Sequence, residues 1–428
     1  MHFPRSTRTS WIVAGVLALV AAAVAAYAVH QLGKPSNHVN TNVAFNPTTP
    51  APAQAVKGKA FLWPFYGGQQ ARTRDFTGDP GLHPPFRLAW RLGGNALLEF
   101  PASIWGNNLY YMDDGATVKR VNATTGKLYW ERHMGTCHGC GLSASTPALD
   151  VAHKLMFVSV LSLTGSTIGA VGGELAAVSM ISGRTVWRYP VPSGSESSPM
   201  VVGNSVYFGD QNGTLRSLNV LTGKLNWAFH TGGAIKAGPA YAGGNLYFGN
   251  YAGSFYAVNA RTGKPVWSVS PGGQFYSTPA VAYGRVYVGN NNGAAYSFDA
   301  ANGALAWSRT LGGYVYSGPA VADTPGLGYT VYIGSYDGYL YALNARTGAT
   351  DWAAYAPGAR PGISGSATVI NNTVYVSTVY QKGSYGFNAT TGKRVFYFPD
   401  GSYTTVVADR GAIFLMGEYV IYKLVPKG

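Results

Sequence analysis

A twelve-residue pattern recurs through most of this chain, and it constrains the fold more than any other feature. It reads YALNARTGATDW at 341–352 and returns as YAVNARTGKPVW at 256–267, YSFDAANGALAW at 296–307 and RSLNVLTGKLNW at 216–227. Three further copies lie at 119–130, 177–187 and 385–396. Seven copies of one pattern indicate an array of equivalent structural repeats.

Each copy predicts a hairpin within a larger unit of four strands. An alternating strand ends in a polar residue, usually Asn or Asp, a turn closes on Gly, and a short strand with an aromatic residue follows. The Asn or Asp side chain binds the backbone ahead of it and Gly accepts a positive φ, so the turn has a physical basis. A second hairpin precedes it, as in NLYFGNYAGSFYAV, and before that a short apolar strand opens on Pro, as in STPAVA. Four antiparallel strands in about 40 residues are typical of a β-propeller blade.

The two ends of the array predict how the ring closes. Segment 85–93, PFRLAWRLG, has an outermost strand with no strands before it, whereas 402–425 has three strands and no fourth. We therefore expect an all-β, eight-bladed β-propeller of four-stranded antiparallel blades, closed by an N-terminal strand that pairs with C-terminal strands. The tryptophan on each outermost strand is interpreted as a structural wedge between blades. These residues are Trp90, Trp130, Trp187, Trp227, Trp267, Trp307 and Trp352.

The N-terminus predicts export. Two arginines precede an uninterrupted apolar run at 11–29, WIVAGVLALVAAAVAAYAV, which is long enough to span a membrane. The positive charge before the run predicts that residues 1–10 lie in the cytoplasm. We expect a single-pass transmembrane anchor at 11–29, a Pro/Thr/Asn/Ala-rich linker at 30–60 and an extracytoplasmic propeller at 61–428. The alternative is a signal segment cleaved near Ala28, which leaves a secreted or periplasmic protein.

The units resemble the pyrroloquinoline-quinone (PQQ) repeat. That repeat is found in quinoprotein alcohol dehydrogenases and in the bacterial outer-membrane assembly lipoprotein with an eight-bladed propeller. The likeness covers about 86–425, and the lead-in WPFYGGQQARTR at 63–74 also resembles the segment before the ring in such proteins. The resemblance implies the fold more specifically than an activity, because the blade motif is a structural device.

Several family features are missing from this chain. The dehydrogenases have a disulfide between adjacent cysteines over the cofactor and a Glu, an Asn and an Asp around calcium. Here the two cysteines, Cys137 and Cys140, are not adjacent, and no calcium trio aligns. Gly141 follows the second cysteine where haem attachment needs His, and no lipidation cysteine follows the apolar run. We therefore expect no cofactor and no metal, with PQQ and calcium as the alternative.

Blade 2 predicts a binding rim. The interval from its opening Pro to its turn Gly is 36 residues (147 to 183), against 24 in blades 3 to 5, and the loop that leads into the blade is also longer. Both additions belong on the same face of a propeller, where extra loops often bind; neutral drift in a tolerant loop is the alternative.

The same face should carry the channel mouth, formed by residues three before each opening Pro. By alignment these are Leu98, Ala144, Glu196, Lys236, Tyr276, Tyr316, Ile363 and Ser402. Glu196, Lys236, Tyr276 and Tyr316, on four consecutive blades, could grip a polar or aromatic ligand. The alternative is structural: an ion pair between Glu196 and Lys236, with the tyrosines filling the funnel.

The CHGC segment at 137–140 favours a disulfide, because two cysteines three apart in an exported chain most readily oxidise to one. A redox-active pair expects a helix start that this Gly-rich loop does not offer. A zinc site built from His133, Cys137, His138 and Cys140 is too crowded for tetrahedral coordination.

The chain has a formal net charge of +14, which suggests an anionic partner or simply a solvated surface. Its basic residues are scattered along the sequence without a nucleic-acid motif, so we expect no nucleic-acid partner. No nucleophile–base pair or phosphate loop is visible. We expect a membrane-anchored binding or scaffold module for an extracytoplasmic protein, peptide or envelope polymer. The alternatives are a minimal PQQ-dependent dehydrogenase of alcohols or sugars and a small-ligand sensor at the channel mouth.

Overall fold

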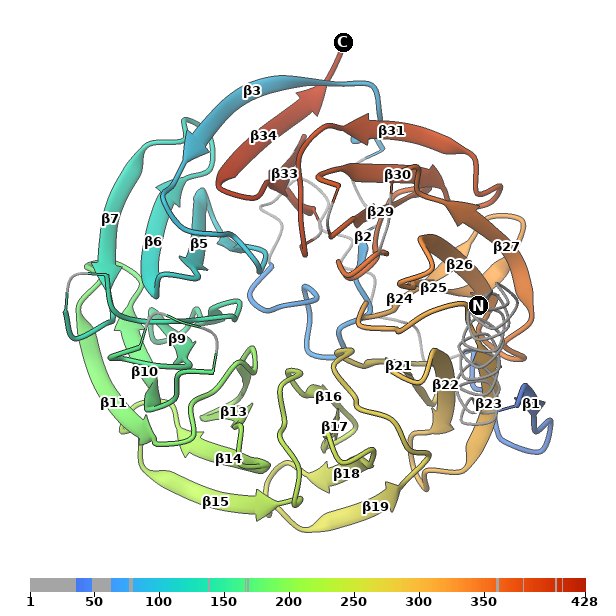
Figure 1. Cartoon of the computed structure of the whole chain (residues 1–428), viewed down its shortest axis with the longest axis horizontal. Coiled ribbons are helices and arrows are strands. Elements are labelled where there is room, and N and C mark those ends of the chain that lie inside the picture. Colours follow the sequence, from blue (N-terminus) through green and yellow to red (C-terminus); the bar gives the residue numbers. More distant parts are fainter. Residues whose placement is uncertain are drawn as a thin grey trace, which may run out of the picture.

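The computed structural model describes residues 36–47, 63–76 and 80–428, apart from 138, 166, 168, 359–361, 380, 405 and 410. The described residues form strands and turns, with no helix, and build eight sheets arranged as a ring of blades (Figure 1). The expected eight-bladed all-β propeller is confirmed.

Within each blade the strands follow one another from the channel outward as A, B, C and D, and each is antiparallel to the next. In blades 1 to 4 they are β4 (Ser103–Trp105), β5 (Asn108–Asp113), β6 (Thr117–Asn122), β7 (Leu128–His133); β8 (Ala148–Asp150), β9 (Leu155–Val160), β10 (Gly173–Ser179), β11 (Thr185–Val191); β12 (Met200–Val202), β13 (Ser205–Gly209), β14 (Thr214–Asn219), β15 (Leu225–His230); and β16 (Ala240–Ala242), β17 (Asn245–Gly249), β18 (Phe255–Asn259), β19 (Pro265–Val269).

In blades 5 to 8 the strands are β20 (Ala280–Ala282), β21 (Arg285–Asn290), β22 (Ala294–Asp299), β23 (Leu305–Thr310); β24 (Ala320–Thr324), β25 (Gly328–Gly334), β26 (Tyr339–Asn344), β27 (Thr350–Tyr355); β28 (Thr368–Ile370), β29 (Thr373–Ser377), β30 (Ser384–Asn388), β31 (Arg394–Phe398); and β32 (Val407–Asp409), β33 (Ala412–Met416), β34 (Val420–Pro426), β3 (Phe86–Gly93). The central strands are buried on both faces, as in β9, because neighbouring blades sandwich them. The outer strands expose alternate residues, as in β15.

The ring closes through its eighth blade. Strand β3, from the N-terminal side, pairs antiparallel with β34 at the C-terminus, from Phe86 opposite Pro426 to Gly93 opposite Val420. This is the predicted closure, and it brings together segments more than 300 residues apart in the sequence. It leaves the last blade with the same four strands as the others.

The repeated turn locks each blade to the one before it. In blade 4, Asn259 accepts the amide of Thr262 at 3.0 Å, and Gly263 has a φ of 71°. The indole of Trp227, from blade 3, donates to Ala260 O at 3.0 Å and lies so close that a Cβ on Gly263 would be 2.6 Å from its ring. Trp90, Trp130, Trp187, Trp267, Trp307 and Trp352 lie against the corresponding glycines of the next blades.

Residues 36–47, within the stretch expected to be a linker, lie against blade 5. β1 (His38–Val39) pairs antiparallel with β23 and adds a fifth strand at the outer edge. Arg285 donates to the carbonyls of Val43 and Ala44 at 2.8 and 2.9 Å, and Phe45 packs against Tyr283. The folded part therefore includes residues before 61, because apolar side chains in this segment find partners on the blade.

A second segment crosses the centre of the ring; residues 63–76 are named the channel strap (Figure 1). Its backbone carbonyls accept amides from the innermost strands of blades 1, 2, 4, 5, 6 and 7. At its end, β2 (Asp75–Phe76) pairs parallel with β28. The strap thus ties most of the ring together from inside.

The predicted transmembrane segment at 11–29 lies outside the described residues, as does residue 138. In the part of the chain that the structure describes, no helix is long and apolar enough to span a membrane.

Candidate functional site

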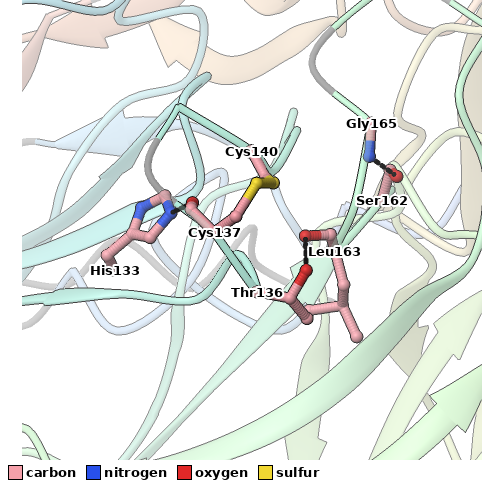
Figure 2. Close-up of a disulfide and its surroundings, with 7 residues drawn as sticks. All are labelled: His133, Thr136, Cys137, Cys140, Ser162, Leu163 and Gly165. Carbon is pink, nitrogen blue, oxygen red and sulfur yellow. Dashed lines mark hydrogen bonds between the residues drawn. A yellow bond between two sulfur atoms is a disulfide. The ribbon is translucent and has the colours of Figure 1, made fainter.

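Two enlarged loops of blade 2 lie side by side (Figure 2). Loop 134–143 leads into the blade and loop 161–172 joins β9 to β10; their described residues are named the blade 2 rim. Three backbone hydrogen bonds of 2.9 Å join the loops: Thr136 N to Leu163 O, Gly141 N to Gly165 O, and Leu161 N to Leu142 O. The two additions therefore form one structure, in which Val171 of the second loop is 54% exposed.

A disulfide between Cys137 and Cys140 fixes the tip of the first loop, with 5.2 Å between the Cα atoms (Figure 2). The disulfide prediction is confirmed. Nε2 of His133 lies 3.2 Å from Cys137 O, and its Nδ1 lies 3.2 Å from Thr117 Oγ1. His133 thus joins the loop to the adjacent strand, and the two sulfurs are bonded to each other rather than to a metal.

The four predicted mouth residues follow one another around the channel. Lys236 Nζ lies 3.1 Å from Glu196 Oε1, and the ammonium also lies 5.0 Å from the ring centre of Tyr251. The rings of Tyr276 and Tyr316 meet edge to face at 5.3 Å. The arrangement contains the ion pair that the structural alternative expected. Whether these residues also bind a ligand stays a prediction.

At three blades the residue at the mouth differs from the one expected. Leu98, Ile363 and Ser402 are buried, and the residue after each lines the channel cavity: Glu99, Ser364 and Tyr403. In blade 1 the loop before the opening Pro is one residue shorter. The amide of Leu98, three residues before Pro101, bonds to Glu418 O, whereas in blade 4 the equivalent bond to Asp210 O comes from Ile235, four residues before Pro239. Blades 7 and 8 lack the opening Pro that set the alignment.

The corrected register brings carboxylates together at the mouth. Glu99 lies near Glu196, and burial together with the Glu196 charge raises the pKa of Glu99 to about 7, against a smaller opposing effect of Lys236. Burial and the neighbouring charges of Glu99 and Asp113 also raise the pKa of Asp114. Sequence reasoning missed both, since neither occupies the counted position before a Pro.

Two arginines of the channel strap fill the channel below the mouth. Arg72 is fully buried and donates from Nε to Pro239 O, from Nη1 to Tyr66 O and from Nη2 to Ser198 O, at 2.7, 2.7 and 3.2 Å. Arg74 is also buried and donates to Pro319 O at 2.9 Å. The sequence held a signal for this contact. Gly238 and Gly318 stand before the opening Pro in blades 4 and 6, where a Cβ would meet the two guanidiniums at 2.8 and 2.7 Å.

The space left at the mouth is small. Tyr66 of the strap hydrogen-bonds to Ser366 and closes the floor, and its ring lies 4.9 Å from the Arg74 guanidinium. The cavity above it, lined by Glu99, Lys236, Tyr276 and Tyr316 among others, has a volume of about 40 Å³. A cavity needs about 10–15 Å³ open to a water-sized sphere to hold one water, so this is room for a few water molecules.

The family described as outer membrane protein assembly factor BamB matches residues 114–235 and 211–421. The two matches together cover well over half of the sequence. The chain belongs to this family. No curated protein sequence matches the chain.

Solved structures share the fold at low identity. BamB from Moraxella catarrhalis has a TM-score of 0.65 and 17% identity, covering 80% of this chain and 98% of that chain. Quinohemoprotein alcohol dehydrogenase from Comamonas testosteroni has a TM-score of 0.70 and 14% identity, covering 88% and 82%. The computationally designed Ika8 protein has a TM-score of 0.64 and 14% identity, covering 78% and 98%. Because an assembly factor, an enzyme and a designed protein all have this architecture, these likenesses establish the fold alone.

Proposed function

We propose that this protein is a membrane-anchored extracytoplasmic scaffold whose blade 2 rim binds a protein of the cell envelope. The observation that carries the proposal is the pairing of two enlarged loops, tied by backbone hydrogen bonds and a disulfide. Ordering such loops before a partner arrives lowers the entropy lost on binding, which is how a recognition surface gains affinity. Two loops that had lengthened by neutral drift would not be expected to hydrogen-bond to each other.

The family supports a protein partner over a small molecule. It is the family of an outer membrane protein assembly factor, which implies contacts between proteins in the envelope. The apolar run at 11–29 supports the anchor, and exposed Val171 offers an apolar contact on the rim. The propeller would then hold the rim at a fixed place relative to the membrane.

The size and charge of the channel mouth support a scaffold that does not bind PQQ. The cofactor is a tricyclic tricarboxylate, whereas the mouth cavity has room for only a few water molecules and its wall carries the carboxylate of Glu99. Among the described residues, no group of three His, Cys, Asp or Glu side chains could hold a metal ion. The disulfide lies on the blade 2 rim, and neither cysteine lines the cavity. The residues at the mouth do not fit this cofactor, and the same small volume weighs against a small-ligand sensor at the mouth.

A loop graft tests the proposal. Residues 161–172 are replaced by 210–213, the four residues that join the equivalent strands of blade 3. The matched control replaces 335–338 of blade 6 by the same four residues. Membranes are dissolved in mild detergent and the native complexes are separated by size.

We expect the wild type and the blade 6 graft to migrate in a complex larger than the protein alone, and the blade 2 graft to migrate alone. A blade 2 graft that stays in the complex contradicts the proposal. A second arm adds PQQ with calcium and follows thermal unfolding and dye reduction with alcohols and sugars. A cofactor at a hundred times its dissociation constant would stabilise by about 2.7 kcal/mol, and such a shift with turnover would replace the scaffold by a dehydrogenase.

A further inference from the structure

The basic residues of this chain are scattered in the sequence, but the fold gathers many of them on one face. All C–D turns occupy the same position in their blades, and each hydrogen-bonds to the A–B turn or to the start of the B strand beside it, as Ala260 N does to Gly244 O at 2.9 Å. These two sets of turns are named the turn face. The D–A and B–C loops, including the blade 2 rim, form the opposite mouth face.

The C–D turns carry a ring of exposed basic side chains: Lys127, Arg184, Lys224, Arg261, Lys264, Arg346 and Lys393. No ion pair among the described residues includes any of them. Two exposed carboxylates lie near these turns, Asp323 and Asp351. Asp150, Asp299 and Asp409 also belong to these turns but are buried, so the exposed charge of the turn face is cationic.

The mouth face has the opposite balance. Its bases are paired with carboxylates, as in Lys119–Asp113, Arg188–Glu174 and Lys236–Glu196. Glu99 and Asp114 add further carboxyl groups there. The two faces therefore differ in the balance of their charges.

Two exposed aliphatic side chains stand among the bases. Ile181 and Leu221 occupy equivalent positions in the C–D turns of neighbouring blades 2 and 3, and they are 65% and 51% exposed. The basic residue after each turn glycine, Arg184 or Lys224, lies three residues further along. Apolar tips flanked by cations are typical of surfaces that enter the interface of a lipid bilayer.

We propose that the turn face docks on the anionic lipid headgroups of a membrane, with Ile181 and Leu221 entering the interface. Equivalent positions in the blades of one ring lie in one plane, so the charges fit a flat membrane surface better than a linear polymer. The apolar tips favour lipid over a soluble polyanion. Docking this way directs the mouth face, with the blade 2 rim, away from the bilayer. The inference does not depend on what that rim binds.

Vesicle co-sedimentation tests the inference with a chain that begins at Ser36. That chain keeps every contact described above, since the ring closes on itself through β3 and β34. Vesicles of neutral lipid are compared with vesicles holding about 30% phosphatidylglycerol, at about 0.1 M salt. The variants reverse charge in two matched sets: Lys127→Glu and Lys224→Glu on the turn face, and Arg91→Glu and Arg132→Glu at exposed positions of outer strands further from that face.

We expect binding to anionic vesicles only, a loss of about 100-fold or more in the turn-face set, and a much smaller loss in the control set. Replacing Ile181→Ser and Leu221→Ser together should weaken vesicle binding about tenfold with no change in charge. Equal losses in the two charge sets, or equal binding to neutral vesicles, overturn the inference. If the serine pair changes nothing and soluble polyphosphate removes the protein from vesicles, the face binds polyanions instead of lipid.

Discussion

The turn face and the mouth face are built from the same eight repeats, yet their chemistry differs. On the turn face the repeats stay alike: the turn glycine recurs, the tryptophan of the preceding blade packs against each of these glycines, and a base follows most of them. On the mouth face the loops diverge in length and in sequence, and blade 2 carries a disulfide-bound rim. Uniform positions build a uniform charged surface, while divergent loops build one local site.

This difference teaches where the packing constraints act. The C–D turns are held by contacts between blades, since the indole of one blade occupies the space beneath the next turn. The B–C loop of blade 2 is free of that contact and can therefore be extended. The channel strap lies between the two faces and fills the centre of the ring with Arg72, Arg74 and Tyr66.

The largest effect is expected where the strap separates the two faces. Arg72→Ala removes a buried guanidinium and leaves three carbonyls without their donors, so we expect a loss of about 3–5 kcal/mol in the free energy of unfolding. Chemical denaturation measures this loss. Arg87→Ala, at an exposed position of β3, is the control and should change stability by less than about 0.5 kcal/mol. Equal effects of the two changes would mean that the contacts of Arg72 do not stabilise the ring.

The next prediction concerns the regularity of the turn face. Gly263→Ala places a Cβ 2.6 Å from the Trp227 ring at a positive φ, and we expect a destabilisation of about 2–4 kcal/mol. Gly203→Ala shares the positive φ, but nothing lies within 4 Å of the added Cβ, so the loss should be about 1 kcal/mol. Thermal unfolding of both variants separates the packing effect from the backbone effect. Similar losses would show that the indole contact does not hold the turn.

The mouth face should show its own pH dependence. Burial raises the pKa of Glu99 to about 7, so the unfolded chain ionises first and the wild type loses stability as the pH rises from about 4.5 to 7. Glu99→Gln removes that loss and should be about 1–3 kcal/mol more stable than the wild type at pH values above 7, with little difference near pH 4. Denaturation across pH measures the effect, with exposed Glu131→Gln as the control. A constant difference at all pH values would contradict the assignment.

The smallest global effect is expected at the blade 2 rim. Replacing Cys137 and Cys140 by serine opens a loop of a few residues, so the loss of stability should stay below about 2 kcal/mol. The change should be local: hydrogen exchange at the amides of Thr136 and Gly141 should quicken, while that of Tyr207 in β13 should not. Faster exchange in both places would assign the disulfide a global role.

Much of the architecture could be predicted from the sequence, because each copy of the repeat corresponds to one blade. The turn motif predicts the hairpin, its spacing predicts the blade, and the incomplete units at both ends predict the closure by β3 and β34. The mouth was harder, since counting from Pro fails where a loop loses one residue, as before Pro101. The charge of the turn face was hidden as well, because residues that lie on one face are about 40 positions apart in the chain.

Photo-crosslinking in cells tests most directly whether the two faces serve different partners. A photoreactive amino acid is placed at Val171 on the blade 2 rim and, in a second strain, at Leu221 on the turn face; both positions are about half exposed, so the probe reaches the surroundings without disturbing the core. We expect a discrete protein adduct from Val171 and lipid adducts from Leu221. A lipid adduct from Val171, or the same protein adduct from both positions, would contradict this account.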